Sequence, residues 1–247
     1  DEDGILYAVL GGDDTGGIVW SPKVLQQAAL TGLYLRADNT LLDTEARDEI
    51  TDDSKLIGPM SEKDIAELRL YTDVELRGRM VTQDDLVWSD RALLDSVLPG
   101  HASELAPVIG WGMTMDRNHV PPITNPHTFS LEWLRTPAGN AVGFHRHHDT
   151  QVLMSVEGEW QITFNRGDDQ ITPTISTETF VSIPRGVWRS FANVGEADAL
   201  MLVVNGTDNR NLIGWDDSIV SAAEAAGWAV DASGYLAAGR VLTRQAR

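Results

Sequence analysis

Three of the six histidines stand within four consecutive positions, at His145, His147 and His148. Residues two apart on a β-strand point to the same face of a sheet, so His145 and His147 would present their imidazoles side by side. Two imidazoles so placed can bind one divalent metal ion. His148 would point the other way, and it is a poor ligand if that opposite face is solvent.

Two patterns of fixed spacing surround this pair. The first consists of Gly139, His145, His147, Gln151 and Gly158, and the second of Glu178, Pro184, Gly186, Arg189 and Asn193. Together they resemble the two motifs of the cupins over residues 139–193, with Glu178 at the place of a family glycine. The resemblance implies an all-β fold, a cupin-type β-barrel (jelly roll) with flanking short helices.

In cupins with a complete metal site, the resemblance implies four ligands: the two histidines, a glutamate and the histidine of the second motif. This chain has Gln151 and Arg189 at the last two places. Gln151 offers a neutral oxygen, which is a weaker ligand than a carboxylate. Arg189 cannot be a ligand, because its guanidinium has no free lone pair, and its charge would repel a divalent ion.

Three interpretations therefore remain open. A divalent metal, with Fe(II) favoured, could bind through His145, His147 and Gln151, completed by water, substrate or another histidine, of which His127 is a better candidate than His101 or His119. Arg189 could instead anchor a carboxylate or phenolate in a metal-free pocket. In the third interpretation this barrel has lost its chemistry and packs against an active one.

Trp188 adjoins Arg189 and could form the wall of a pocket that takes an aromatic ring, so both residues are candidate substrate-binding positions. A tryptophan in a strand-like stretch also commonly packs in the core. Both roles remain open for Trp188.

The stretch from about residue 105 to 205 predicts a succession of short strands. Phe129, Leu131 and Trp133 alternate with their neighbours, and proline and glycine turns separate the apolar runs. We expect an all-β barrel or sandwich that a strand at residues 200–204 closes.

The first 43 residues are similar in sequence to a segment near the end of the chain. When residues 1–43 are shifted by 195, ten positions are identical without a gap, at Asp3, Val9, Gly11, Asp13, Ile18, Trp20, Ala28, Gly32, Ala37 and Leu41. Each copy predicts an apolar strand (5–10 and 200–204), a loop, a tryptophan and a helix. The helices have Ser21, and Asp216 or Asp217, as N-caps, and they end before Gly32 and Gly227.

The repeat implies a bicupin of which this chain is the later part. We expect residues 1–44 to be the closing strand and helix of a first cupin repeat, residues 45–104 a linker with short helices, and residues 105–247 a cupin barrel with a C-terminal helix. The first barrel would lie on a separate chain or cleaved fragment, whose strands would pair with residues 5–10. We also expect an oligomer.

The chain has 37 acidic and 19 basic side chains and a formal charge of −18, which disfavours nucleic acid and anionic membranes as partners. It has no cysteine, so disulfides and thiolate metal sites are excluded. No apolar run is long enough to span a membrane, and the acidic start has no cationic flank of a secretion signal. We expect a cytoplasmic protein.

Many bicupins are non-haem iron dioxygenases, so the resemblance implies an oxidoreductase that acts on a small oxygenated, possibly aromatic, substrate. In that hypothesis His145 and His147 hold the iron, Gln151 is a weak ligand or a hydrogen-bonding group beside it, and Arg189 orients an anionic substrate. The alternative is a catalytically silent cupin half that serves as a ligand-binding or oligomerisation module.

Overall fold

The structure is a computed structural model, and it describes residues 6–9, 20–38, 40–46, 48–51, 55–58, 61–67, 70–124, 127–207 and 209–239. These residues fall into two compact units, each described here by itself. One unit holds the described residues between 12 and 76, and the other holds those from 77 onward together with residues 6–9.

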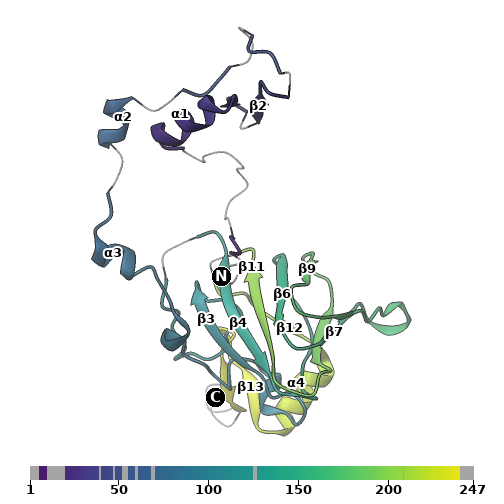
Figure 1. The fold of residues 1–247 in the computed structure, drawn as a ribbon. Coiled ribbons are helices and arrows are strands. Elements are labelled where there is room, and N and C mark those ends of the chain that lie inside the picture. Colours follow the sequence, from purple (N-terminus) through teal and green to yellow (C-terminus); the bar gives the residue numbers. More distant parts are fainter. Residues whose placement is uncertain are drawn as a thin grey trace. The chain divides into compact units, whose positions relative to one another are not determined.

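The larger unit contains two antiparallel sheets of five strands each (Figure 1). The strands of the first sheet, in spatial order, are β3 (Glu104–Ile109), β4 (Ser130–Thr136), β11 (Ala199–Asn205), β6 (Gln151–Glu157) and β9 (Phe180–Ile183). Those of the second are β12 (Gly214–Trp215), β5 (Ala141–Arg146), β10 (Arg189–Asn193), β7 (Trp160–Phe164) and β8 (Thr174–Ile175).

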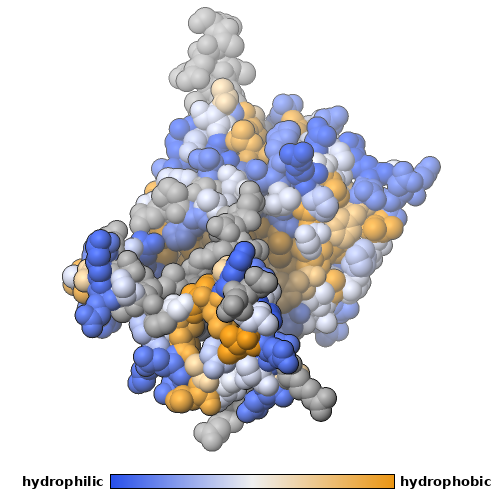
Figure 2. Space-filling model, turned by 90° about the horizontal axis from the view of Figure 1, so that it is seen from above, coloured by the Kyte–Doolittle hydropathy of each residue, from blue (hydrophilic) through white to orange (hydrophobic). Residues whose placement is uncertain are grey.

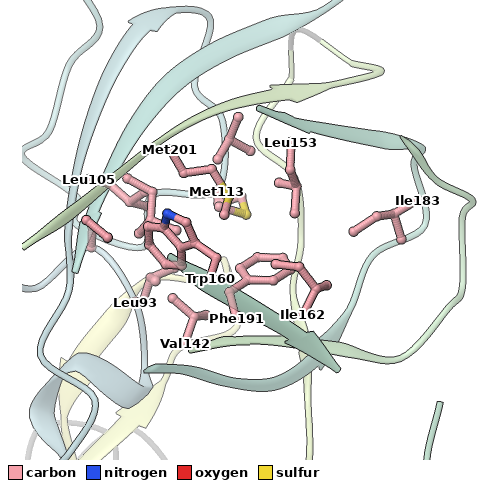
Figure 3. Close-up of a cluster of buried hydrophobic side chains, with 14 of the residues drawn as sticks. Leu93, Leu105, Met113, Val142, Leu153, Trp160, Ile162, Ile183, Phe191 and Met201 are labelled. Carbon is pink, nitrogen blue, oxygen red and sulfur yellow. The ribbon is translucent and has the colours of Figure 1, made fainter. Parts of the chain in front are cut away.

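This architecture confirms the expected all-β jelly roll. The predicted strand at residues 200–204 is β11, which lies in the centre of the first sheet rather than at a seam. Among the described residues the two sheets stay separate hydrogen-bonded sheets, so the fold is a jelly-roll sandwich and not a closed barrel. The core between them is apolar and contains Trp160, Ile162, Phe191, Leu153 and Met201 (Figure 3).

The direction of the side chains on β4 is the reverse of what hydrophobicity alone would suggest. Ser130, Glu132 and Leu134 are buried, whereas Leu131 and Trp133 are only partly buried. A strand places alternate side chains on opposite faces, so β4 directs a serine and a glutamate into the interior. These inward polar positions prepare the site described below.

The structure confirms both predicted helices of the repeat. Helix α1 spans Pro22–Leu30 with Ser21 as its N-cap, and α4 spans Asp217–Ala225 with Asp216 as its N-cap. Gly32 and Gly227 follow these helices with φ values of 78° and 83°, a left-handed conformation that favours glycine.

The repeat extends further in three dimensions than the strand and helix that the sequence predicted. After α1 come the paired strands β1 (Leu33–Leu35) and β2 (Leu41–Asp43), and after α4 come the paired strands β13 (Trp228–Val230) and β14 (Leu236–Ala238). Each element of the second copy begins and ends 195 positions after its counterpart in the first copy. The strands of the two hairpins pair in the same register.

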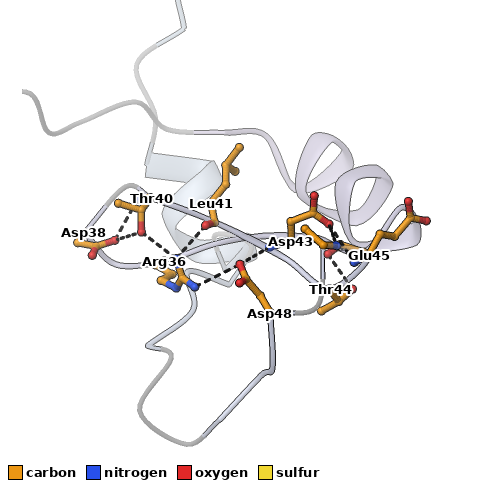
Figure 4. Close-up of polar contacts among 10 residues, drawn as sticks. Arg36, Asp38, Thr40, Leu41, Asp43, Thr44, Glu45 and Asp48 are labelled. Carbon is orange, nitrogen blue, oxygen red and sulfur yellow. Dashed lines mark hydrogen bonds and ion pairs between the residues drawn. The ribbon is translucent and has the colours of Figure 1, made fainter.

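Arg36 and the acidic residues near it hold the first hairpin in shape (Figure 4). Arg36 donates to the carbonyl of Leu41 at 2.8 Å and pairs with Asp48 at 3.6 Å. The carboxylate of Asp38 accepts hydrogen bonds from the backbone and side chain of Thr40. The remaining short helices are α2 (Glu62–Glu67), α3 (Asp73–Arg77), η2 (Gln83–Asp85), η3 (Asp95–Val97) and η4 (Gly167–Asp169).

The expected N-terminal strand at residues 5–10 is only partly described, since Ile5 and Leu10 lie outside the described residues. Residues 6–9 do not pair with any strand in the described part of the chain. The ring of Tyr7 lies 5.7 Å from that of Phe180 on the edge strand β9. Among the described residues, no helix is long and apolar enough to cross a bilayer.

Gly158 and Gly139, the two glycines that bound the first motif, allow a matched test of packing. Both have positive φ, 85° and 71°, but a Cβ on Gly158 would lie 2.5 Å from the Cβ of Ala199, whereas one on Gly139 would meet no described atom within 4 Å. We expect Gly139→Ala to lower the free energy of unfolding by about 1–2 kcal/mol through backbone strain alone. Gly158→Ala should cost a further 1–3 kcal/mol, roughly, through overpacking. Urea unfolding of the two variants measures the difference, and equal losses would contradict it.

Candidate functional site

The imidazoles of His145 and His147 lie inside the jelly roll, beside one another. Their side chains are 0% and 1% exposed, and their ring centroids are 5.1 Å apart. His145 stands near the end of β5, where it pairs with Arg189 of β10 on one side and with Trp215 of β12 on the other. The sequence spacing predicted this juxtaposition of the two histidines.

A hydrogen bond fixes the tautomer of His145. Its Nδ1 lies 2.7 Å from the carbonyl oxygen of Gly143. Because a carbonyl can only accept, Nδ1 must carry the proton and Nε2 of the neutral ring must carry a lone pair. Nε2 has no hydrogen-bond partner among the described residues, and neither has Nδ1 or Nε2 of His147.

Both imidazoles are held in the neutral form. Burial lowers the pKa of His145 to about 3, and the charge of Arg189 adds to this effect. Burial, the charge of Arg189 and the neighbouring histidines lower the pKa of His147 well below its usual value, and the side chain of Asn211 acts in the opposite direction. The site therefore presents imidazole lone pairs at neutral pH.

Arg189 is a fully buried cation whose guanidinium reaches across to the other sheet. Its Nη2 donates to Oε1 of Gln151 at 3.1 Å, and its Nη1 donates to the carbonyl of Val187 at 3.0 Å. Its Nε has no partner in the described part of the chain. Burial lowers the pKa of Arg189 to about 9, so the side chain stays protonated at neutral pH.

A chain of hydrogen bonds leads from Arg189 to a buried carboxylate. Nε2 of Gln151 donates to Oδ1 of Asn205 at 2.9 Å, and Nδ2 of Asn205 donates to Oε1 of Glu132 at 2.9 Å. Both oxygens of Glu132 also accept from the backbone N–H of Met113 at 3.0 Å. Burial raises the pKa of Glu132 to about 7.

Sequence reasoning missed Glu132 and Asn205. Both stand at inward positions of strands whose register brings them together, since Asn205 pairs with Ser130 on one side and with Gln151 on the other. A polar residue at a core position of an alternating strand was the signal that could have found them. Asn211 and Trp215 also belong to this site, and no spacing pointed to them.

Several buried polar atoms at this end of the jelly roll have no partner among the described residues. They are His145 Nε2, both ring nitrogens of His147, Arg189 Nε, Asn211 Oδ1 and Trp215 Nε1. An unpaired polar group in the interior costs about 1–3 kcal/mol, so a cluster of them indicates a place that a small polar molecule or ion completes.

The residues present do not fit a divalent metal ion in this arrangement. The described residues contain no group of three histidine, aspartate or glutamate side chains that could hold one. The oxygen of Gln151 already accepts from Arg189, and a buried guanidinium next to the two histidines opposes a second cation. We therefore derive no chemical step through a metal in this jelly roll.

The other histidines considered as ligands have partners of their own. His101 lies 3.3 Å from the carboxylate of Asp95, and Nδ1 of His119 lies 3.2 Å from the hydroxyl of Thr114. His127 packs its ring against Phe129. None of the three joins the pair in a described metal-ligating group, and His148 is exposed.

Trp188 directly precedes strand β10 and contacts two arginines. Its ring is partly buried between the guanidiniums of Arg146 and Arg166, which are 5.0 and 4.6 Å from the ring. Neighbours on an extended chain point to opposite faces, so Trp188 points outward where Arg189 points inward. Two aromatic rings lie against His145 instead: that of Phe191 at 5.2 Å and that of Trp215 at 5.5 Å.

Part of the jelly roll matches a known protein family. Residues 132–205 match the family model described as Cupin domain. This match includes the hydrogen-bonded side chains of Glu132, Gln151 and Asn205. It also includes the two histidines and Arg189. Residues 132–205 of the jelly roll therefore match a cupin domain, as the two motifs predicted.

The chain is also similar to solved structures. A recombinant oxalate oxidase in complex with glycolate is 21% identical with a TM-score of 0.39, and the match covers 48% of this chain and 56% of that one. The Schizosaccharomyces pombe Cnp3 cupin domain is 17% identical with a TM-score of 0.33, covering 43% and 65%. A variant of the oxalate decarboxylase of Bacillus subtilis is 16% identical with a TM-score of 0.34, covering 43% and 26%.

This chain spans about half the length of the oxalate oxidase that it matches. No curated protein matches the chain.

The neutral histidines make stability depend on pH. An unfolded histidine takes up a proton near pH 6.5, whereas His145 does so only at about 3, so stability is lost as the pH falls below 6.5. Between pH 6.5 and 5 we expect His145 to remove about 2 kcal/mol of stability, and His147 to add to this loss in the same direction. The double variant His145→Gln and His147→Gln should flatten this slope in urea unfolding at pH 7, 6 and 5.

The exposed His148 gives the control, because His148→Gln should leave the slope as in the wild type. A slope that is equally steep in the double variant would show that these imidazoles are not held neutral.

Proposed function

We propose that the cupin domain of this chain is a binding module that holds a small anion, of the size of a carboxylate group, against Arg189 without a resident metal ion. The observation that carries this proposal is the position of the guanidinium. It bonds to Gln151, the residue at the family's glutamate position, and it is buried beside both histidines. A fixed positive charge thus takes the role that a metal cation has in a complete site.

The unpaired atoms support an anionic ligand. Arg189 Nε and Trp215 Nε1 are N–H donors that lack partners among the described residues, and one nitrogen of neutral His147 is a donor as well. Three donors, one of them charged, suit the oxygens of a carboxylate. In this proposal Gln151 orients the guanidinium, and the lone pair of His145 accepts a hydrogen bond from a hydroxyl on the same ligand.

Acetate is the simplest probe of this site. We expect it to shift the NMR signals of the Trp215 indole and the His145 ring, and Arg189→Met to weaken its affinity roughly ten- to a hundredfold, because a hydrogen bond to a charged group is lost. Arg185→Met removes an exposed cation outside the cluster and should leave the affinity unchanged. Equal binding by Arg189→Met and the wild type, or no binding by the wild type, would refute the proposal.

The second candidate is the non-haem iron dioxygenase that the cupin resemblance implies, acting on a small oxygenated, possibly aromatic, substrate. One observation favours it: the tautomer of His145 leaves Nε2 free as a lone-pair donor, with His147 beside it. For this activity, the guanidinium of Arg189 would have to move away from Gln151 and the histidines. Otherwise the activity would belong to another cupin domain of the protein.

Metal content separates the two candidates. We expect the wild-type chain to retain little Fe(II), and the double variant Gln151→Glu and Arg189→His to bind it roughly a hundredfold more tightly. A hundredfold change corresponds to about 3 kcal/mol. Removing a positive charge and adding a negative one near a divalent ion favours binding by more than this before the cost of burying the new charge is subtracted. Elemental analysis after dialysis and titration calorimetry measure the change.

Wild-type protein that holds one iron per chain, and loses it in the variant His145→Ala and His147→Ala, would favour the enzyme. Oxygen uptake with catechols, hydroquinones and 1,3-diketones would then be the next measurement.

A further inference from the structure

The chain contains two copies of one small structural element, which we call caps. The N-terminal cap comprises Trp20 with α1, β1 and β2, and the C-terminal cap comprises Trp215 with α4, β13 and β14. Each cap has a tryptophan followed by an N-capped helix of nine residues and a short antiparallel hairpin, and all element boundaries differ by 195 positions.

The C-terminal cap is seated on the jelly roll through an apolar face. Trp215 and Ala223 are buried in the core, and four partly buried side chains pack against it: Ile219, Val220, Trp228 and Leu236. Trp215 also pairs with His145 through β12 and β5, so this cap contributes a wall to the polar site.

The N-terminal cap has an apolar residue at every one of these six positions. A shift of 195 places Trp20, Val24, Leu25, Ala28, Leu33 and Leu41 at the positions of Trp215, Ile219, Val220, Ala223, Trp228 and Leu236. The apolar character of this face is therefore retained at all six positions, and three of the six residues are identical.

That face is largely uncovered in the N-terminal cap. Trp20 and Val24 are each 44% exposed and Leu41 is 62% exposed, whereas Trp215 is only 8% exposed. Helix α1 has no buried residue. Figure 2 shows orange hydrophobic patches on the face of the molecule in view. An exposed cluster of large apolar residues marks an interaction surface.

We propose that the N-terminal cap docks on a second cupin jelly roll that lies outside residues 1–247, and that Trp20 there lies against the first-motif histidine as Trp215 lies against His145. The jelly roll of this chain cannot be the occupant, because its corresponding seat is filled by the C-terminal cap. The matching length, register and apolar face specify a seat of the same shape. This proposal is independent of what the site around Arg189 binds.

The absence of cysteine from residues 1–247 allows a selective cross-linking test. Trp20→Cys and Leu41→Cys are each labelled with a benzophenone maleimide, added to an extract of cells that make the protein, and irradiated. We expect Trp20→Cys to cross-link to a peptide that contains two histidines one residue apart and that does not belong to residues 1–247. Leu41→Cys should cross-link to the same polypeptide.

Gln26→Cys is the matched control, because Gln26 is exposed on α1 outside the six apolar positions. It should give a several-fold lower yield of that cross-link. Leu41→Cys covers the case in which the tryptophan substitution disturbs the cap, since Leu41 is well exposed. Cross-links confined to residues 1–247, a yield equal to that of Gln26→Cys, or no cross-link from either variant would overturn the proposal.

Discussion

The buried guanidinium of Arg189 is the constraint on which the interior of this cupin domain depends. A cation without solvent must find hydrogen bonds and a compensating charge, or the fold loses several kcal/mol. The donors run in one direction, from Arg189 to Gln151, to Asn205 and to Glu132. Each amide therefore accepts on the side of Arg189 and donates on the side of Glu132. Because burial raises the pKa of Glu132 to about 7, this side chain compensates the charge of Arg189 fully only above neutral pH.

This arrangement explains why the two departures from the family's ligand set occur together. A glutamine can accept from a guanidinium and donate onward to Asn205 at the same time, which a carboxylate cannot do, because an ionised carboxylate has no donor. A glutamate at residue 151 would face the lone pairs of Asn205 Oδ1 with lone pairs of its own. Gln151 and Arg189 are thus linked physically, because the side chain of Gln151 accepts a hydrogen bond from the guanidinium of Arg189 and donates one to Asn205.

The sequence was most informative where local rules decide the structure. Helix caps at Ser21 and Asp216, the glycines after both helices and the parity of His145 and His147 follow from backbone geometry, and the structure has all of them. The polar chain was not predictable in the same way, because it requires knowing which strands are neighbours. Glu132 and Gln151 meet only through Asn205, on a strand some 50 to 70 positions later.

The two tryptophans Trp188 and Trp215 also show that position in the sequence does not by itself predict which residues lie at the site. Adjacency to Arg189 in the sequence left both a pocket wall and a core position open for Trp188; in the structure its ring lies near the guanidiniums of Arg146 and Arg166. Trp215 reaches the histidines because β12 adds to the edge of the second sheet. The shift of 195 positions between the two caps, in contrast, could be detected in the sequence. Only the structure showed that the similarity includes the hairpin after each helix.

The ring of Tyr7 lies near an exposed phenylalanine at the edge of the first sheet. Strand β9 is the outermost strand of its sheet, so one of its sides offers free backbone groups to any other chain, and Phe180 is 55% exposed there. The aromatic ring of Tyr7 lies over that residue and obstructs the approach of a foreign strand. A variant without its first residues would lose the contact of Tyr7 and expose an edge strand that favours aggregation by strand pairing.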